Sequence, residues 1–276
     1  MSDSPANGSG PDNPPLRLGG MALRNGLLIH GPTSWSVAAR TPDGRIEVAS
    51  GPKPTLARGR LGSIPVLRGP LRLVEAMAVI PLARMRLRSV RLPFEDRAVI
   101  LAMLGSTLAT RLARGLWRAT AAREAVVAAI GALPALTALR DTDLAAYHGV
   151  EHKAIGGYET GRDPAEVPKE HERCGSNLIG PMLLLSIAGQ LVVERVLDDP
   201  GPLVRTGVAA GAAGIAVELF SYAERHPESG VGRAVQGPGY EIQRLLSTRE
   251  PTPEQMEVGR AALDEILRAE GVAPAA

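Results

Sequence analysis

Three of the five histidines fall within residues 148–171, and the only cysteine follows at position 174. The first part of this stretch reads Tyr147-His148-Gly149-Val150-Glu151-His152-Lys153. On a helix, His148, Glu151 and His152 stand at i, i+3 and i+4, so their side chains project from one face. Two imidazoles one turn apart can bind one zinc ion, and a carboxylate between them can act as a general base. H-x-x-E-H is also the inverzincin peptidase motif; the alternative is a solvated helix face.

A second group of potential ligands follows at once, in the run His171-Glu172-Arg173-Cys174-Gly175-Ser176-Asn177. The cysteine lies three residues after His171, which is a ligand-like spacing, and a thiolate near a metal has a lowered pKa. A buried, inert thiol or a thiol-based redox function is the alternative for Cys174. Because both groups flank a single connection, we expect them to converge.

Glu218 is an isolated carboxylate in an apolar stretch. An ionisable group in such a place is costly unless it is paired or coordinated, so Glu218 is a candidate for a distant third ligand. A salt bridge to Arg205 or Arg225 is the alternative. His226, just before a proline, suits the surface.

The elements that must position these residues divide the chain into four regions. Residues 1–18 are rich in Gly, Pro, Ser and Asn and are expected to be a disordered tail. Residues 19–97 hold a β-hairpin around Asp43-Gly44 and a basic amphipathic segment over 71–90. Residues 98–248 form the helical domain that carries the site, and residues 249–270 a C-terminal amphipathic helix. That last helix begins with a capping box. Thr252 is the N-cap, Pro253 takes the first helical position, and Gln255 completes the box three residues after the cap.

Four apolar stretches differ in how well they suit a membrane span, which needs about 20 apolar residues. Residues 98–116 contain two arginines, and residues 125–139 contain a glycine and a proline, so we expect neither to span. Residues 178–193 carry no charge, and residues 208–222 carry Glu218 as their one charged residue. Stretches that are apolar on all sides must be buried in protein or in lipid. We expect the last two to form a membrane-embedded hairpin; wholly buried helices of a soluble protein are the alternative.

The composition supports a helical frame. Aromatic residues make up 3% of the 276 residues, although hydrophobic residues make up 45%. Such an aliphatic composition favours close helix packing, including packing in lipid, with genomic base-composition bias as the competing cause. The predicted fold class is mainly α: a helical bundle with membrane-embedded apolar helices, plus a small N-terminal β-hairpin region.

The charge distribution points to membrane lipid, and not to nucleic acid, as a partner. Basic and acidic side chains nearly balance, at 31 against 29, which excludes bulk nucleic-acid binding. Nine arginines between residues 58 and 97 are interleaved with aliphatic residues, which suits membrane phosphates. If all four stretches span, these arginines and the 140–177 loop share one side. Positive-inside counting then predicts a multi-pass cell-membrane protein whose site faces the cytoplasm.

The two central motifs resemble those of the bacterial YqhQ-like family, a domain of unknown function that is labelled metal-dependent. The family's signature reads roughly Tyr-His-Gly-Ala-Glu-His-Lys, followed by His-Pro-Arg-Cys-Gly-Thr. The chain matches it over residues 147–153 and 171–176, with departures at Val150, Glu172 and Ser176.

The resemblance extends to the rest of the chain. Residues 19–32 are similar to the family's N-terminal block, although Met21 stands where the family usually has Gln. Glu218 matches the glutamate of a Ser-Tyr-Glu element, and residues 243–251 match the closing block. The resemblance implies membrane association and a metal-dependent activity, with no substrate.

These observations predict a divalent-metal site. Its first-choice ligands are His148 and His152, and the remaining places are contested by His171, Cys174 and Glu218. Zinc is the first expectation, with Fe²⁺ or Mn²⁺ if carboxylates dominate the shell.

The predicted activity is hydrolysis of an amide or ester bond in an unknown substrate. Glu151 would be the general base, and Lys153 or Arg173 would stabilise an oxyanion. The alternative is a non-enzymatic membrane scaffold in which the His/Cys cluster is a structural metal staple or a hydrogen-bonded core. A closed site with four protein ligands and no pocket would favour the scaffold.

Overall fold

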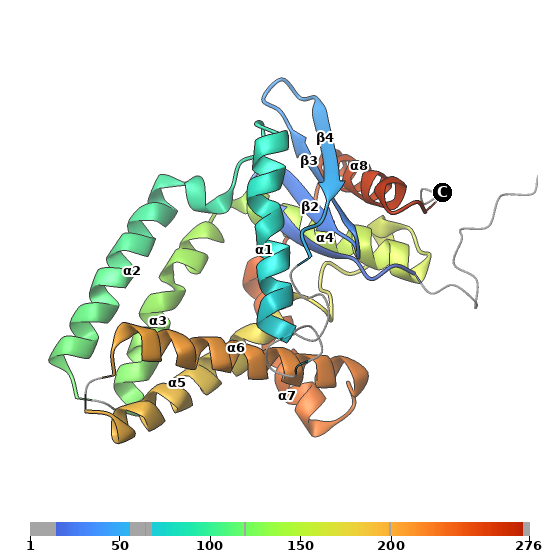
Figure 1. The fold of residues 1–276 in the computed structure, drawn as a ribbon. Coiled ribbons are helices and arrows are strands. Elements are labelled where there is room, and N and C mark those ends of the chain that lie inside the picture. The colour runs from blue at the N-terminus through green and yellow to red at the C-terminus, as the bar shows by residue number, and fades with distance from the viewer. Residues whose placement is uncertain (1–14, 56–63, 65–67, 119, 199, 273–276) are drawn as a thin grey trace, which may run out of the picture.

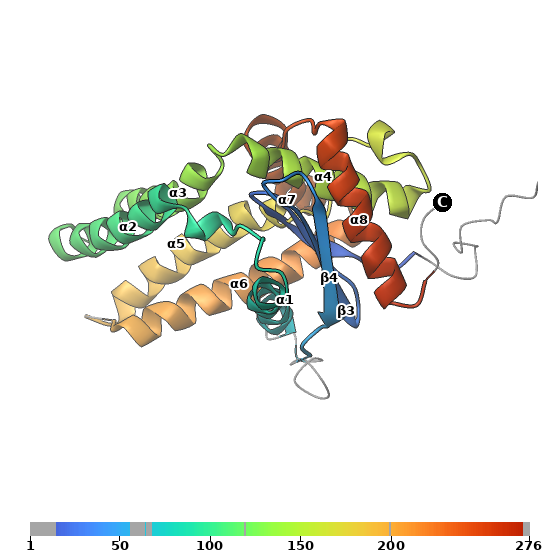
Figure 2. The same cartoon turned by 90° about the horizontal axis from the view of Figure 1, so that it is seen from above.

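The fold has two parts that lie side by side (Figure 1). The computed structural model describes residues 15–55, 64, 68–118, 120–198 and 200–272. One part is a four-stranded sheet with helices on both faces, and the other consists of four long helices that all project to the same side (Figure 2). The predicted class, mainly α with apolar candidate membrane helices and a small N-terminal β region, is confirmed.

The sheet is an antiparallel meander in the order β1-β2-β3-β4. Its strands are β1 (Gly19–Leu23), β2 (Gly26–His30), β3 (Ser34–Arg40) and β4 (Ile46–Pro52). The predicted hairpin is formed by β3 and β4, and its turn contains Gly44 at a φ of 86°, which favours glycine. β1 and β2 lie outside the prediction, because five-residue strands show too little alternation to be recognised.

Helices cover both faces of the sheet. Alternate strand residues point to opposite faces, so Leu28 and Val37 pack toward α1 (Arg68–Arg86), while Leu27 and Ile29 pack toward α4 (Thr142–Thr160) and α8 (Pro253–Ala269). α1 corresponds to the predicted basic amphipathic segment. α4, which holds the H-x-x-E-H motif, thus belongs to the helical layer on the sheet.

The C-terminal helix α8 begins with the predicted capping box. The Gln255 backbone N–H donates to Thr252 Oγ1 (3.3 Å), and the Thr252 N–H donates to Gln255 Oε1 (3.0 Å). These two bonds satisfy amide groups that a helix start otherwise leaves without partners.

The four projecting helices all have the length and composition of membrane spans. They are α2 (Arg97–Leu116), α3 (Ala121–Ala138), α5 (Ile179–Val196) and α6 (Pro202–Arg225). The expectation that the first two fall short is wrong, since among the described residues four spans qualify, with mean hydropathies from 1.3 to 1.6. Only 17% of each span is buried inside the protein, so their apolar side chains face outward, as in lipid.

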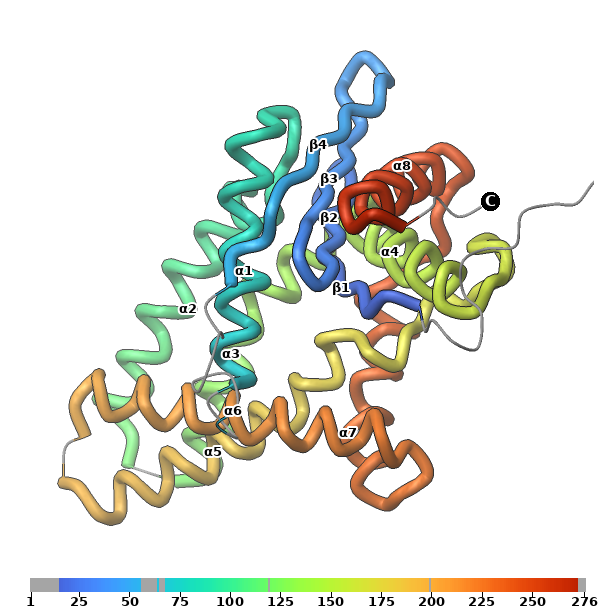
Figure 3. The backbone as a smooth tube through the Cα atoms, turned by 45° about the vertical axis from the view of Figure 1, so that its right-hand side comes forward, coloured from blue at the N-terminus to red at the C-terminus, as the bar shows by residue number. Residues whose placement is uncertain are grey.

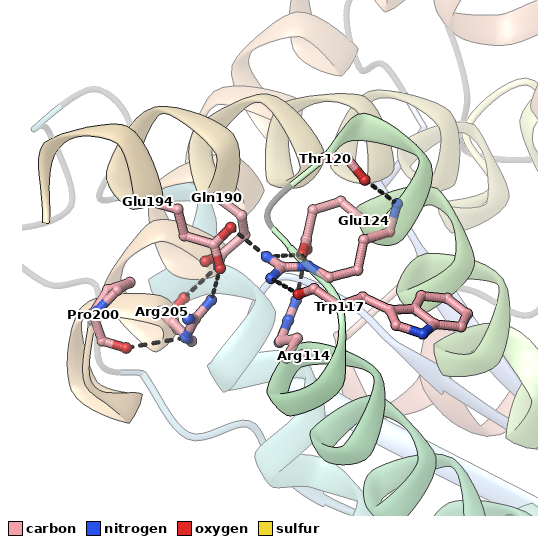
Figure 4. Close-up of polar contacts among 9 residues, drawn as sticks. Arg114, Trp117, Thr120, Glu124, Gln190, Glu194, Pro200 and Arg205 are labelled. Atoms are coloured by element: carbon pink, nitrogen blue, oxygen red, sulfur yellow. Dashed lines mark hydrogen bonds and ion pairs between the residues drawn. The ribbon is translucent and has the colours of Figure 1, made fainter. Parts of the chain in front are cut away.

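A buried network of charged side chains joins these helices at the end farthest from the sheet (Figures 1 and 4). Arg123 of α3 donates to its neighbour Glu124 and to Glu194 of α5. Arg205 of α6 also donates to Glu194 (2.5 Å), and Arg114 of α2 donates to Glu124 (2.9 Å). Because Arg123 and Glu124 are only 5% and 2% exposed, each charge depends on its partners for compensation.

After α6 the chain returns toward the sheet through α7 (Gly230–Ile242) and a π-helical turn, Gln243–Ser247. α7 lies within the predicted helical domain, although its glycines and Pro238 disfavour a helix in isolation. Tertiary packing overrides this propensity. The backbone at Gly239 lies so close to Asn177 that a Cβ there would meet the amide oxygen at 2.0 Å.

Most of the predicted tail, residues 1–14, lies outside the described residues. The residues that follow lie against α4: the Leu16 N–H donates to the Tyr158 hydroxyl (3.1 Å), and Leu18 is buried in the core. The N-terminal strands, α4 and α8 share one core.

Candidate metal centre

α4 is held in place along nearly its whole length. The Asp141 side chain caps its start, and Gly161 ends it in the left-handed conformation at a φ of 65°. Where the helix meets the segment before α8, a Cβ on Gly149 would lie 2.2 Å from the Arg249 carbonyl oxygen, so only glycine fits. This contact fixes the height and rotation of the helix that carries His148, Glu151 and His152.

The two imidazoles of α4 are oriented by backbone carbonyls. His148 Nδ1 lies 2.7 Å from the Ser247 carbonyl oxygen, and His152 Nδ1 lies 2.6 Å from that of Lys169. Each Nδ1 therefore carries the proton, which leaves the Nε2 lone pair free to bind a ligand. The ring centroids are 4.4 Å apart, and among the described residues the buried His152 Nε2 has no hydrogen-bond partner.

Cys174 completes a group of three donors. Its Sγ lies 3.4 Å from His148 Nε2, and the donor atoms of His148, His152 and Cys174 all lie within 4.8 Å of one another. We call these three residues the three-donor group. Cys174 also caps the short 3₁₀ turn Gly175–Leu178 that leads into α5. Burial, together with the nearby Glu151 carboxylate, raises the pKa of the Cys174 thiol to about 11.

His171 lies beside the three-donor group without joining it. Its ring centroid is 5.6 Å from that of His152. Both ring nitrogens have partners: Nδ1 accepts the Arg173 backbone N–H (3.2 Å), and Nε2 lies 3.3 Å from Glu159 Oε2. Burial lowers the pKa of His171. In this arrangement His171 lines the site. Because both of its ring nitrogens already have partners, neither offers a free lone pair to a metal bound by the three-donor group.

Glu151 is buried below strand β1. Burial raises the pKa of its carboxyl group, and the neighbouring His148 and His171 oppose this effect. β1 passes directly over the side chain: a Cβ on Gly20 would lie 2.6 Å from Glu151 Cγ. Gly20 is thus a site residue that motif spacing did not reveal; its signal in the sequence was membership of the block 19–32 that resembles the family's N-terminal block.

A cavity of about 510 Å³ opens beside these residues. One wall is polar and contains the three-donor group, Glu151, His171 and Arg173. The lining also includes apolar residues from β1, α1 and the near ends of the projecting helices: Met21, Leu73, Met77, Pro93 and Leu139. The site therefore lies at the junction between the sheet part and the four apolar helices.

Two predicted site residues are not brought to this cavity. The Lys153 ammonium donates to the carbonyls of Ala165 (3.1 Å) and Val167 (2.8 Å) and pairs with Glu250 (2.6 Å). Glu218 accepts from Arg68 Nε (2.8 Å), because the end of α6 packs against the start of α1.

Gln243 is a positioning residue that sequence reasoning missed. It is fully buried in the π-helical turn, where its Oε1 accepts the His171 backbone N–H (2.7 Å) and its Nε2 donates to Ser176 Oγ (2.9 Å). It therefore holds both ends of the loop that carries Cys174. Its membership of the closing motif block was the only available signal.

Comparison with known proteins places the chain in a family without assigning an activity. It is 32% identical over 134 residues to the "Uncharacterized protein YqhQ" of Bacillus subtilis (strain 168), an alignment that covers 46% of this chain and 41% of the relative. The chain thus matches less than half the length of that protein. No solved structure matches. Residues 127–269, which include α4, the three-donor group and α8, match the family model described as "Protein of unknown function (DUF1385)". This match covers more than half of the chain, which therefore belongs to the DUF1385 family.

Proposed function

We propose that the protein is a metal-dependent membrane enzyme, a hydrolase whose divalent metal is held by His148, His152 and Cys174. One observation carries the proposal. Two imidazoles with their Nδ1 atoms engaged by carbonyls turn toward a thiol at the wall of a cavity, and the buried His152 Nε2 lacks a partner. An unpartnered buried nitrogen is costly, and a metal ion would satisfy it.

The donor set fits zinc best. Two imidazole nitrogens and one thiolate are typical zinc ligands, whereas Fe²⁺ and Mn²⁺ sites of the predicted kind would need carboxylates in the shell. Glu218 is paired with Arg68 and does not reach the group. Glu151 stands at the cavity wall, where it can act on a substrate and need not serve as a ligand.

Three protein donors beside a cavity favour a catalytic site over a structural staple. Structural zinc sites use four protein ligands and are closed, while catalytic sites keep one position for water or substrate. Here the fourth candidate, His171, is engaged by Glu159 and by the Arg173 backbone, and the cavity lies next to the group.

The chemistry then divides among residues of this chain. A bound divalent metal supplies a Lewis acid that makes water more acidic and polarises a carbonyl group. Glu151 accepts the proton of the attacking water. Arg173, whose side chain lines the cavity and pairs with Glu159, stabilises the negative oxygen that develops on an ester or amide carbonyl.

Replacing Glu151 with glutamine tests this assignment. We expect Glu151→Gln to retain metal but to slow hydrolysis about 10²- to 10⁴-fold, the usual contribution of a general base. The measurement combines metal analysis of the full chain in detergent micelles with a panel of fluorogenic ester and amide amphiphiles. Glu166→Gln, at an exposed position, is the matched control. Equal rates in Glu151→Gln and wild type, or a wild type that cleaves neither class, would contradict the proposal.

The proposed location is the cell membrane, with the metal site on the cytoplasmic side. In support, the near ends of the four apolar helices adjoin the sheet part, and so do the arginines of α1. The far end also carries Arg118 and Arg195, but it holds fewer of the chain's arginines, and Arg114, Arg123 and Arg205 there are paired with Glu124 and Glu194. We expect a C-terminal fluorescent-protein fusion to fold and fluoresce and a C-terminal alkaline-phosphatase fusion to be inactive. The opposite pattern would reverse the topology.

A further inference from the structure

The start of α1 meets the end of α6 (Figure 3). A second cavity, of about 480 Å³, lies at this junction. α1 approaches α6 so closely that a Cβ on Gly69 would lie 2.7 Å from Val217 Cγ1. The cavity is strongly polar in its lining and is rich in one residue type: Arg17, Arg68, Arg72, Arg173 and Arg225.

Carboxylates compensate only part of this positive charge. Arg17 pairs with Glu224 (3.0 Å), Arg68 pairs with Glu218, and Arg173 pairs with Glu159. Among the described residues, neither Arg72 nor Arg225 forms an ion pair, and Glu172 is the one other acidic residue in the lining. The Arg72 guanidinium and the terminal nitrogens of Arg225, whose Nε donates to the Ser221 carbonyl (2.9 Å), therefore remain available to a ligand.

The position of the cavity limits the chemical class of ligand that it can bind. α6 is a candidate span, and it ends at Arg225. On α1, the apolar side chains of Leu73, Val74 and Met77 are exposed next to Arg72. Arginines beside exposed aliphatic residues at the end of a membrane helix lie at the level of lipid phosphates.

We propose that this arginine cavity binds a phosphate group, through Arg72 and Arg225, at the membrane surface. The planar guanidinium fork matches two phosphate oxygens, which favours a phosphate over a small halide. Two sources carry this chemistry: the headgroup of an anionic lipid and a free phosphate compound.

The site is separate from the candidate metal centre, although Arg173 lines both cavities. A phosphate held by Arg72 and Arg225 would lie next to the metal-site cavity. The proposed phosphate binding does not depend on a metal ion being bound at the metal centre.

The test measures binding of two probes to the full chain in dodecyl maltoside micelles. Inorganic phosphate is titrated by calorimetry, and dioctanoyl phosphatidylglycerol is compared with dioctanoyl phosphatidylcholine by native mass spectrometry. We expect Arg72→Gln/Arg225→Gln to weaken binding at least about tenfold, as loss of a charge-assisted hydrogen bond requires. Both arginines are exposed, so the substitutions should leave the fold intact. The control, Arg88→Gln/Arg91→Gln, makes the same charge change at exposed positions outside the cavity.

The two probes distinguish a lipid headgroup from a free phosphate compound as the source of the bound phosphate. Preference for phosphatidylglycerol over phosphatidylcholine, with weak binding of inorganic phosphate, identifies a lipid headgroup. Tight binding of inorganic phosphate without a lipid preference identifies a free phosphate compound. Arg72→Lys/Arg225→Lys keeps the charge but loses the fork, and should bind with intermediate strength. Binding of neither probe, or equal weakening in the control variant, would overturn the proposal.

Discussion

Replacing His148 and His152 together with alanine will reduce the metal content of the purified full-length protein from about one zinc ion per chain to background. The expectation rests on geometry: these residues supply two of the three converging donor atoms, and Cys174 alone cannot hold a divalent ion at equilibrium. His152→Ala alone should have nearly the same effect, since it removes the one donor that has no other partner. Inductively coupled plasma mass spectrometry of protein purified without added metal makes the measurement.

The control for this prediction is His226→Ala, because His226 is exposed and lies outside the three-donor group. Its metal content should equal that of the wild type. If the wild type carries no stoichiometric metal, or if the double variant keeps it, the three-donor group is a hydrogen-bonded cluster and the proposed function fails with it. A chelator should also lower the melting temperature of the wild type and leave the double variant unchanged, because a ligand stabilises only a fold that binds it.

The second large effect is expected far from the metal centre, in the network that joins the projecting helices. Glu194→Leu should lower the free energy of unfolding by about 3–5 kcal/mol, because it leaves Arg123 and Arg205 with too little compensation at a buried position. Denaturant unfolding of the full chain in micelles measures the change.

Two further variants make this result specific. Glu241→Leu breaks an exposed pair with Arg244 and should cost less than about 1 kcal/mol. Arg123→Met/Glu194→Leu removes one charge of each sign and should recover much of the lost stability, so the two substitutions will be non-additive. Equal losses for Glu194→Leu and Glu241→Leu would show that the network does not hold the helices together.

Features governed by neighbouring residues could be predicted from the sequence. The capping box of α8, the β3–β4 hairpin and the common face of His148, Glu151 and His152 each depend on contacts within a few positions. The convergence of Cys174 with the two histidines also follows from short connections, since the intervening loop is brief.

Features governed by contacts between distant residues could not be predicted from the sequence. Glu218 belongs to an apolar helix whose direction brings it to Arg68, and nothing in the spacing distinguishes that partner from a metal. α2 was underestimated because its two arginines were counted as obstacles to a span, and α3 because Gly131 and Pro134 interrupt it. In the structure Arg114 lies at a helix end and is neutralised by Glu124. The carbonyls that orient the imidazoles come from Ser247 and Lys169, and backbone atoms leave no trace in residue type.

The three donors belong to two different parts of the fold. His148 and His152 are fixed to the sheet through α4, whereas Cys174 immediately precedes Gly175, where the third candidate span begins. Metal–ligand distances tolerate only about 0.2 Å of error. The tilt of a membrane helix, by contrast, adjusts to the thickness of the surrounding bilayer. Under the proposed function, a change in lipid environment that tilts α5 would therefore move the sulfur relative to the imidazoles and change the geometry of the metal centre.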